Sequence, residues 1–221
     1  MPIGGEILCV GDSLTHGARD DFGLHYPELL GQVLSERHGQ TWVCFEYGVN
    51  GEKSADILRR FHSLVRGFPK ASEVLLWMGT NDAKVSCVPI DVFRRNVESA
   101  VRTCKFYGKP LILGLLPGAK GFGAPDHVSN AMIEKYNEVL IDVVDQESNP
   151  LVWYCDLRGL KPEHFCDGIH LTHEGNQWVA EQWANLIERQ RHYIPEATEA
   201  PGSRVRPSTP AAPKAGPTPP P

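Results

Sequence analysis

Four short blocks of polar residues that could carry chemistry are spread along the 221-residue chain. They are Gly11-Asp12-Ser13-Leu14, Gly48 to Glu52, Gly79-Thr80-Asn81-Asp82 and Asp167-Gly168-Ile169-His170. A serine hydroxyl becomes a good nucleophile when a neighbouring base takes its proton, and neutral imidazole suits that task near physiological pH. A carboxylate on the other ring nitrogen would fix the imidazole. Ser13, His170 and Asp167 are therefore a candidate nucleophile, base and orienting acid.

Each of the first three blocks also has a simpler explanation. Ser13 could cap the N-terminus of a helix, since serine is common at that position. Gly51 could belong to an ordinary turn, and Asn81-Asp82 could cap the helix that begins further along the chain. Taken singly, each block favours these structural roles.

The last block allows metal binding as an alternative. Asp167, His170 and His173 follow one another at three-residue spacing, and all three are acceptable ligands for zinc or manganese. A second cluster of such residues does not accompany them in the sequence. We therefore expect neither a metal nor an organic cofactor.

The elements that must position these residues alternate along the chain. Buried strands are predicted at residues 7–10, 42–45, 74–77, 111–113 and 151–154, and helices at about 26–38, 54–66, 90–107, 127–147 and 173–191. Apolar strands alternating with helices predict a three-layer α/β/α sandwich around a five-stranded, mainly parallel sheet. In such a sheet the ligand site lies beyond the carboxyl ends of the strands, which is where the polar blocks fall.

The four blocks, in this order, resemble the GDSL family, also called SGNH hydrolases, over residues 6–191. The resemblance implies the flavodoxin-like SGNH fold and a triad of Ser13, Asp167 and His170. It also implies an oxyanion hole made by the backbone N–H groups of Ser13 and Gly51 and the side-chain amide of Asn81. Asn50 departs from the residue that the family commonly has before the glycine.

Gly51 is chosen from two glycines, and two further residues, Gly79 and Asp12, are expected to support this site. We choose Gly51 over Gly48 as the oxyanion donor by matching the following segment to the family, and a missing Cβ there would let the chain approach closely. Gly79 would open room beside Asn81. Asp12 is expected outside the triad, as a buried carboxylate whose accepted N–H bonds hold the Ser13 turn.

Composition restricts the partners and the compartment. A formal charge of -5 with scattered charges excludes a basic stripe for nucleic acid. The six cysteines show no regular spacing, so we expect neither disulfides nor a zinc site, and we expect most of them to be small buried thiols. No apolar run approaches the length of a membrane span and no signal peptide is evident, so we expect a cytoplasmic protein.

The composition changes at residue 195. The last 27 residues contain nine prolines and almost no large apolar side chain, so they cannot form a packed core. We expect a hydrolase domain at residues 1–194 and a Pro-rich disordered tail at 195–221. The tail could be a polyproline ligand for a protein partner or a plain solvated segment.

The expected activity is hydrolysis of a carboxylic ester through an acyl-enzyme on Ser13. A small acyl ester, an acetylated carbohydrate and a lysophospholipid are the candidate substrates. The same triad could instead transfer the acyl group to an acceptor hydroxyl, or the fold could serve as a noncatalytic binding module. The glycine-rich loop at residues 116–123, with Phe122, is either a mobile lid or an ordinary loop.

Overall fold

The computed structural model describes residues 3–20, 23–84, 86–121 and 123–191. Its strands are β1 (Ile3–Gly11), β2 (Thr41–Gly48), β3 (Glu73–Trp77), β4 (Leu111–Gly114) and β5 (Val152–Cys155). Its α-helices are α1 (Ser13–His16), α2 (Tyr26–His38), α3 (Ser54–Gly67), α4 (Ile90–Phe106), α5 (Asn130–Gln146) and α6 (His173–Arg191). A single 3-10 turn, η1, covers Pro162–His164.

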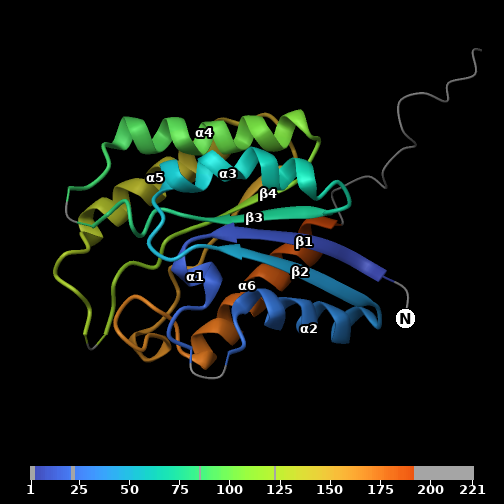
Figure 1. Cartoon of the computed structure of the whole chain (residues 1–221), viewed down its shortest axis with the longest axis horizontal. Helices are drawn as coiled ribbons and strands as arrows, with labels where there is room; N and C mark the ends of the chain where they lie inside the picture. The colour runs from blue at the N-terminus through green and yellow to red at the C-terminus, as the bar shows by residue number, and fades with distance from the viewer. Residues whose placement is uncertain (1–2, 21–22, 85, 122, 192–221) are drawn as a thin grey trace, which may run out of the picture.

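The strands form one sheet in the order β2-β1-β3-β4-β5, and each neighbouring pair is parallel. Helices α3, α4 and α5 cover one face of this sheet, and α1, α2 and α6 lie on the other (Figure 1). The predicted three-layer α/β/α sandwich is therefore confirmed. The strand order is the flavodoxin-like one.

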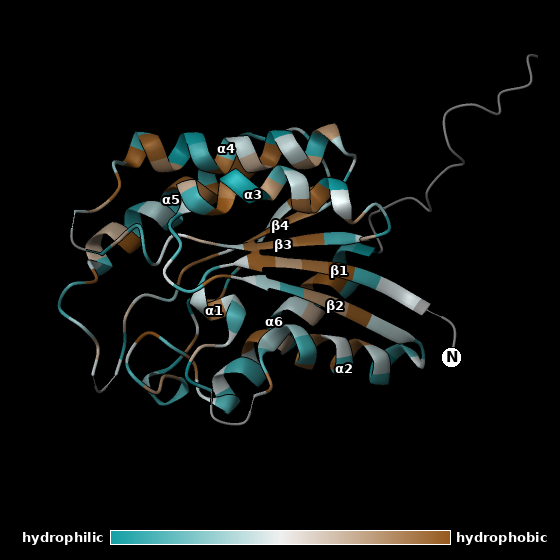
Figure 2. Cartoon of the chain, in the orientation of Figure 1, coloured by the Kyte–Doolittle hydropathy of each residue, from teal (hydrophilic) through white to brown (hydrophobic). Residues whose placement is uncertain are grey.

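Apolar strands and two-faced helices explain why the chain adopts this arrangement. Every residue of β3 and β4 is buried, as expected for strands covered on both faces, and both strands are strongly apolar in Figure 2. On α3, the buried residues Ile57, Phe61 and Val65 recur at four-residue spacing and turn one helical face to the sheet. The sheet and these helical faces share a continuous core.

Two helices differ from the sequence prediction. Helix α1 is a single short turn directly after β1, too brief to give a periodic pattern. Helix α5 begins at Asn130 rather than near residue 127, because the Ser129 side chain caps it by accepting a hydrogen bond from Met132 N at 3.3 Å. The proposed domain boundary and the Pro-rich tail at 195–221 lie outside the described residues.

The six cysteines are free thiols, as the sequence predicts. Cys9, Cys104 and Cys155 are buried in the core, and Cys166 is exposed. Within the described ranges, no helix combines the length and the apolar character that a membrane span requires.

The order of the strands determines where a ligand can bind. The chain moves from β1 to one side, into β2, and later returns to the other side of β1 with β3. A parallel sheet opens a crevice at such a reversal, beyond the carboxyl ends of the strands. Gly11 at the end of β1 pairs with Gly48 of β2 and Trp77 of β3, so the three strands end on a shared rung.

Two asparagines of the α5 segment hold the loop that follows β4. The Asn137 amide accepts from Leu116 N at 2.7 Å and donates to Leu116 O at 2.9 Å, and it is buried. Asn130 repeats this geometry at an exposed position, where it accepts from Ala119 N at 2.8 Å and donates to Ala119 O at 3.0 Å. These bonds satisfy backbone groups that have left the sheet.

This pair predicts a graded loss of stability. Asn137→Ala leaves both polar groups of Leu116 buried without a partner, so we expect the free energy of unfolding in urea to fall by about 2 to 4 kcal/mol. Asn130→Ala removes the same bonds where water can replace them, and its loss should stay below about 1 kcal/mol. Equal losses in the two variants would show that burial of the loop is not what makes Asn137 important.

Candidate active site

The first block forms a tight turn at the end of β1. Asp12 is the N-cap of α1, and its Oδ1 accepts a hydrogen bond from Leu14 N at 3.0 Å. Ser13 is the first residue of the helix. The capping role that the sequence allows for Ser13 thus belongs to Asp12, which leaves the Ser13 hydroxyl for another partner.

That partner comes from the last block. His170 Nε2 lies 3.0 Å from Ser13 Oγ, and His170 Nδ1 lies 2.8 Å from Asp167 Oδ2. A short antiparallel bridge between Phe165 and Leu171 closes the segment into a tight loop before α6. The structure therefore brings the three predicted triad residues into one hydrogen-bonded chain.

Asp167 is held in its charged form. Burial alone would raise the pKa of this carboxyl, but hydrogen bonds from the backbone and ring of His170 and from Ile169 N outweigh burial and lower the pKa. The backbone bonds to Asp167 Oδ1 measure 2.8 Å from His170 and 3.1 Å from Ile169. Arg19 adds an ion pair, with its Nε at 3.1 Å from Asp167 Oδ2. Asp167 is thus ready to orient the imidazole and to face a positive charge on it.

The second block contains two glycines with different tasks. Gly48 lies at the end of β2, where a Cβ would approach within 2.2 Å of His16 N, so its missing side chain lets α1 pack closely. Gly51 has φ of +79°, and a Cβ there would meet nothing within 4 Å. The close approach expected at Gly51 is thus made by Gly48 instead, and Gly51 is required for its left-handed backbone.

The backbone donors predicted for the oxyanion hole are free to act. Within the described ranges, no protein acceptor takes the N–H of Ser13 or of Gly51. The N–H groups of Thr15 and His16 both donate to Asp12 O, at 3.2 Å and 3.0 Å. Ser13 N–H is therefore the group of this turn that remains available to a ligand.

Asn81, the third predicted donor, lies buried between the first two blocks. Its Nδ2 donates to Glu52 O at 3.0 Å and to Asp12 Oδ2 at 3.2 Å. The amide therefore joins the Ser13 turn to the Gly51 loop. To serve as an oxyanion donor it would give up one of these bonds, and the longer bond to Asp12 is the weaker one.

Gly79 does not open room beside Asn81, contrary to expectation. A Cβ on Gly79 would lie 2.7 Å from Leu116 Cδ1 and 3.2 Å from two ring atoms of Phe93, and its φ is +128°. The space beside Gly79 is thus filled by the core rather than left for a ligand. Gly79 lets the chain after β3 turn sharply against packed side chains.

Asp82 caps a helix, but not the one that follows it in sequence. Its carboxylate accepts from Ser54 N at 2.8 Å and from Ser54 Oγ at 2.5 Å, at the start of α3. Asn96 Nδ2 of α4 donates to the same Ser54 Oγ at 2.8 Å. Burial raises the pKa of Asp82, and its bonds to Ser54 oppose that rise. Asp82 thereby ties the Asn81 loop to the helix that follows Gly51.

Asp12 also has an unusually high pKa for an aspartate. It is 1% exposed, and burial raises its pKa to about 7 despite the hydrogen bond from Leu14 N. The nearby charge of Asp82 raises the pKa further. Asp12 lies beside Ser13, and its carboxylate bonds to Leu14 N and to the Asn81 amide rather than to His170.

The alternative of a metal site at the last block finds no geometric support. In the part of the chain that the structure describes, no three His, Cys, Asp or Glu side chains gather as ligands would. The ring of His173 lies instead beside Gln177, with 3.0 Å between Nε2 and the amide nitrogen, and 3.9 Å from Asp20. These contacts of His173 are with residues of its own helix and of the loop after α1.

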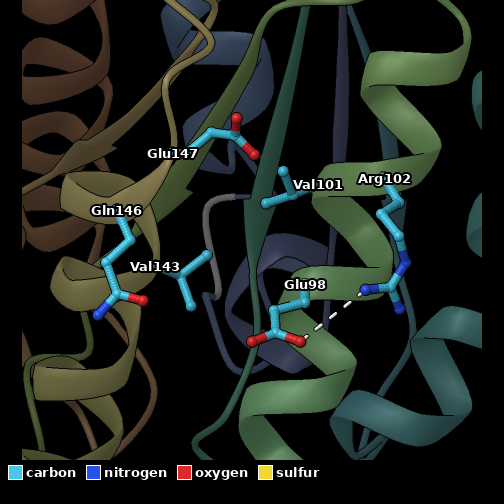
Figure 3. Close-up of a pocket in the computed structure, with 6 residues that line it drawn as sticks. All are labelled: Glu98, Val101, Arg102, Val143, Gln146 and Glu147. Carbon is cyan, nitrogen blue, oxygen red and sulfur yellow. Dashed lines mark ion pairs between the residues drawn. The ribbon is translucent and has the colours of Figure 1, made fainter.

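A separate hollow lies between α4 and α5 (Figure 3). On the α4 side Glu98 and Arg102 form an ion pair at 3.8 Å, and on the other side lie the polar residues Gln146 and Glu147. Its lining contains no serine, cysteine or histidine: Glu98, Val101, Arg102, Val143, Gln146 and Glu147. This hollow therefore lacks the Ser and His pair that the loops after β1 and β5 bring together.

Two contributors to this region were not predicted from the sequence. Arg19 belongs to none of the four blocks, and its side chain is 69% exposed. It nevertheless forms an ion pair with Asp167. Arg60 resembles an ordinary charged residue of an amphipathic helix, yet it contacts Glu52 of the second block. Phe122 of the glycine-rich loop lies outside the described residues.

Several solved structures share the fold of this chain. The chain is similar to a lipase/acylhydrolase from Enterococcus faecalis, with a TM-score of 0.71 and 21% identity over 84% of this chain and 96% of that one. It is similar to an aryl esterase from M. smegmatis, with a TM-score of 0.70 and 17% identity over 85% and 100% of the two chains. A carbohydrate acetylesterase from Sinorhizobium meliloti gives a TM-score of 0.68 and 16% identity over 84% and 99%. At these identities the likeness shows the fold.

The family is established by the sequence itself. A search of curated proteins found no match. The model of the GDSL-like Lipase/Acylhydrolase family, however, matches residues 9–178, which include all four blocks. This chain therefore belongs to the GDSL-like lipase/acylhydrolase family.

Proposed function

We propose that this chain hydrolyses carboxylic esters through a covalent acyl-enzyme on Ser13. The observation that carries the proposal is the unbroken chain of hydrogen bonds from Asp167 through His170 to Ser13, with links of 2.8 Å and 3.0 Å. Both distances lie in the range over which a proton can pass between a nucleophile and its base. The family assignment, with esterases among the similar structures, agrees with this chemistry.

In the first half-reaction, Ser13 Oγ attacks the ester carbonyl while His170 Nε2 takes its proton. The bond to the alcohol oxygen then breaks, and the imidazolium returns the proton to the departing alcohol. Asp167 remains ionised throughout and stabilises the positive ring. Its lowered pKa suits it to that role.

The negative oxygen formed by this attack needs fixed donors. The N–H groups of Ser13 and Gly51 belong to separate loops, and the Asn81 amide bonds to a neighbour of each, Asp12 and Glu52. Each preorganised donor of this kind contributes about 3 kcal/mol to the transition state in well-studied hydrolases. We assign Ser13, Gly51 and Asn81 as the oxyanion hole.

In the second half-reaction, water attacks the acyl group on Ser13. His170 accepts the proton of that water and then returns it to Ser13 Oγ as the acid leaves. No metal or organic cofactor takes part in this scheme. An acceptor hydroxyl in place of water would make the same intermediate an acyl donor, and free acid and transferred ester are separated by product analysis.

The proposed substrate class is an ester of a small acyl group, an acetylated carbohydrate or a lysophospholipid. One similar structure is that of a carbohydrate acetylesterase and another that of an aryl esterase. A panel of nitrophenyl esters of increasing acyl length, together with an acetylated sugar and a lysophospholipid, distinguishes these substrates.

Replacing the nucleophile tests the proposal. Ser13→Ala should lower kcat on p-nitrophenyl acetate by about a thousandfold or more, because the covalent route is lost. A fluorophosphonate should label the wild type and leave this variant unlabelled. Ser63→Ala, which alters an exposed serine on α3, should retain both activity and labelling. Wild-type turnover by a folded Ser13→Ala protein would refute the acyl-enzyme on Ser13.

The buried carboxylate beside the nucleophile predicts a pH effect on stability. In the unfolded chain Asp12 ionises near pH 4, whereas in the folded protein its pKa is about 7. The folded state therefore holds more protons between these values, and stability falls as pH rises through this window. The isosteric Asp12→Asn variant lacks this titration.

We therefore expect the two proteins to diverge as the pH rises. Between pH 5 and pH 8, the wild type should lose about 2 kcal/mol of unfolding free energy relative to Asp12→Asn. Chemical denaturation of both proteins at pH 5 and at pH 8 gives the four unfolding free energies. Subtracting the change in Asp12→Asn from the change in the wild type removes the contributions of all other titrating groups. Parallel stability profiles would show that Asp12 is ionised at pH 5 in the folded protein.

A further inference from the structure

Arg60 of α3 makes an unusually complete set of contacts for a helical arginine. Its Nε and Nη2 donate to Glu52 Oε2 at 2.9 Å and 2.7 Å. Its Nη1 donates to Tyr47 O at 2.9 Å, and Nη2 also donates to Gly11 O at 3.0 Å. The side chain is 23% exposed, whereas that of the neighbouring Arg59 is 77% exposed and pairs with Asp56 on its own helix.

The acceptors of Arg60 belong to the loops that carry the proposed oxyanion donors. Gly11 precedes the Asp12-Ser13 turn, and Glu52 directly follows Gly51. The carbonyl of Glu52 in turn accepts the hydrogen bond from Asn81 Nδ2 at 3.0 Å. One guanidinium therefore connects the segments of all three donors, although it belongs to none of them.

The geometry requires the planar fork of an arginine. The Gly11 and Tyr47 carbonyls lie at the ends of neighbouring strands, and Glu52 lies beyond them, so the acceptors surround the group on several sides. A guanidinium presents five donors in fixed directions, whereas a lysine ammonium is a single flexible point. Lysine at position 60 could keep the charge but not all of these bonds.

Arg60 also affects the proposed oxyanion hole through its positive charge. The Glu52 side chain is only 18% exposed and follows the residue whose N–H would face the developing oxyanion. An unpaired carboxylate so close to that negative oxygen would oppose its formation. Arg60 neutralises the carboxylate with two hydrogen bonds to one of its oxygens.

We propose that Arg60 is a positioning residue for the oxyanion hole, acting through Gly11, Tyr47 and Glu52 on the N–H groups of Ser13 and Gly51 and on the Asn81 amide. The inference rests on the proposed ester hydrolysis and extends it to a residue outside the four blocks. The alternative is a purely structural role for Arg60. In that case the Glu52–Arg60 pair would stabilise the fold, and its loss would leave the turnover of the folded protein unchanged.

The primary test replaces each of two adjacent arginines by lysine. Arg60→Lys should lower kcat on p-nitrophenyl acetate by about tenfold to a hundredfold with KM changed less than about threefold, since displaced donors weaken the transition state more than the substrate complex. Arg59→Lys keeps the same charge on the same helix and should leave both constants unchanged. A folded Arg60→Lys protein with wild-type kcat would overturn the inference.

A double-mutant cycle identifies the route of the effect. If Arg60 acts through the oxyanion donors, Arg60→Lys should cost much less when Asn81→Ala has already removed one of them, and the two losses should not multiply. Losses that multiply fully would assign Arg60 to another role. If Arg60→Lys does not fold, Glu52→Gln replaces it in the cycle, with an expected loss of kcat of several fold and the same criterion.

These outcomes are separable from failure of the proposed function. If Ser13→Ala retains wild-type turnover, the proposed hydrolysis through Ser13 is refuted, and the positioning role of Arg60 loses its foundation. Loss of activity in Ser13→Ala together with full activity in Arg60→Lys would preserve the proposed function and reject only the positioning role.

Discussion

The site depends on how closely the ends of β1, β2 and β3 approach one another. Gly11 pairs with both Gly48 and Trp77, and a Cβ on Gly11 would lie 2.1 Å from Thr15 Oγ1 and 2.5 Å from Trp77 O. A larger residue at Gly11 or at Gly48 would push α1 away from the sheet. Because Gly11 and Gly48 leave room for α1, the chain can turn sharply after β1. Ser13 in this turn then lies within hydrogen-bond distance of His170, which comes 157 residues later in the sequence.

Three carboxylates of the candidate site lie in different surroundings, which shift their pKa values in different directions. Asp167 receives enough hydrogen bonds to keep its pKa low, which suits a group that must face an imidazolium. Burial raises the pKa of both Asp12 and Asp82, whose bonds are directed to N-terminal turns of helices instead. Asp12 and Asp82 therefore organise the loops, while Asp167 supplies the fixed negative charge.

Much of the fold could be predicted because its signals are local. Helix α2 begins and ends at the predicted residues 26 and 38, and β3 differs from its prediction only by Glu73. Strand β1 is longer than predicted, because Gly4 and Gly5 carry no apolar signal of their own. In the fold these glycines lie against the ring of Trp42, which covers the start of the strand.

The site was predictable where a motif lies within one segment, as for Asp167 and His170. The roles of Gly48, Gly79, Asp82 and Arg60 depend on which distant segments lie beside them, and sequence spacing contains no such information. Gly79, for example, faces Leu116 and Phe93, which come from two other parts of the chain. An arginine on a helix is usually solvated, so only the folded chain distinguishes Arg60 from Arg59.

The central claim is that an acyl group is carried on Ser13, and the most direct measurement detects that intermediate. The enzyme is mixed with p-nitrophenyl acetate, quenched in acid within milliseconds, digested and examined by mass spectrometry. The account predicts an acetyl group on Ser13 that appears with the first turnover and decays as acetate is released. Steady release of product with Ser13 unmodified at every time, or with the acetyl group on another residue, would contradict it.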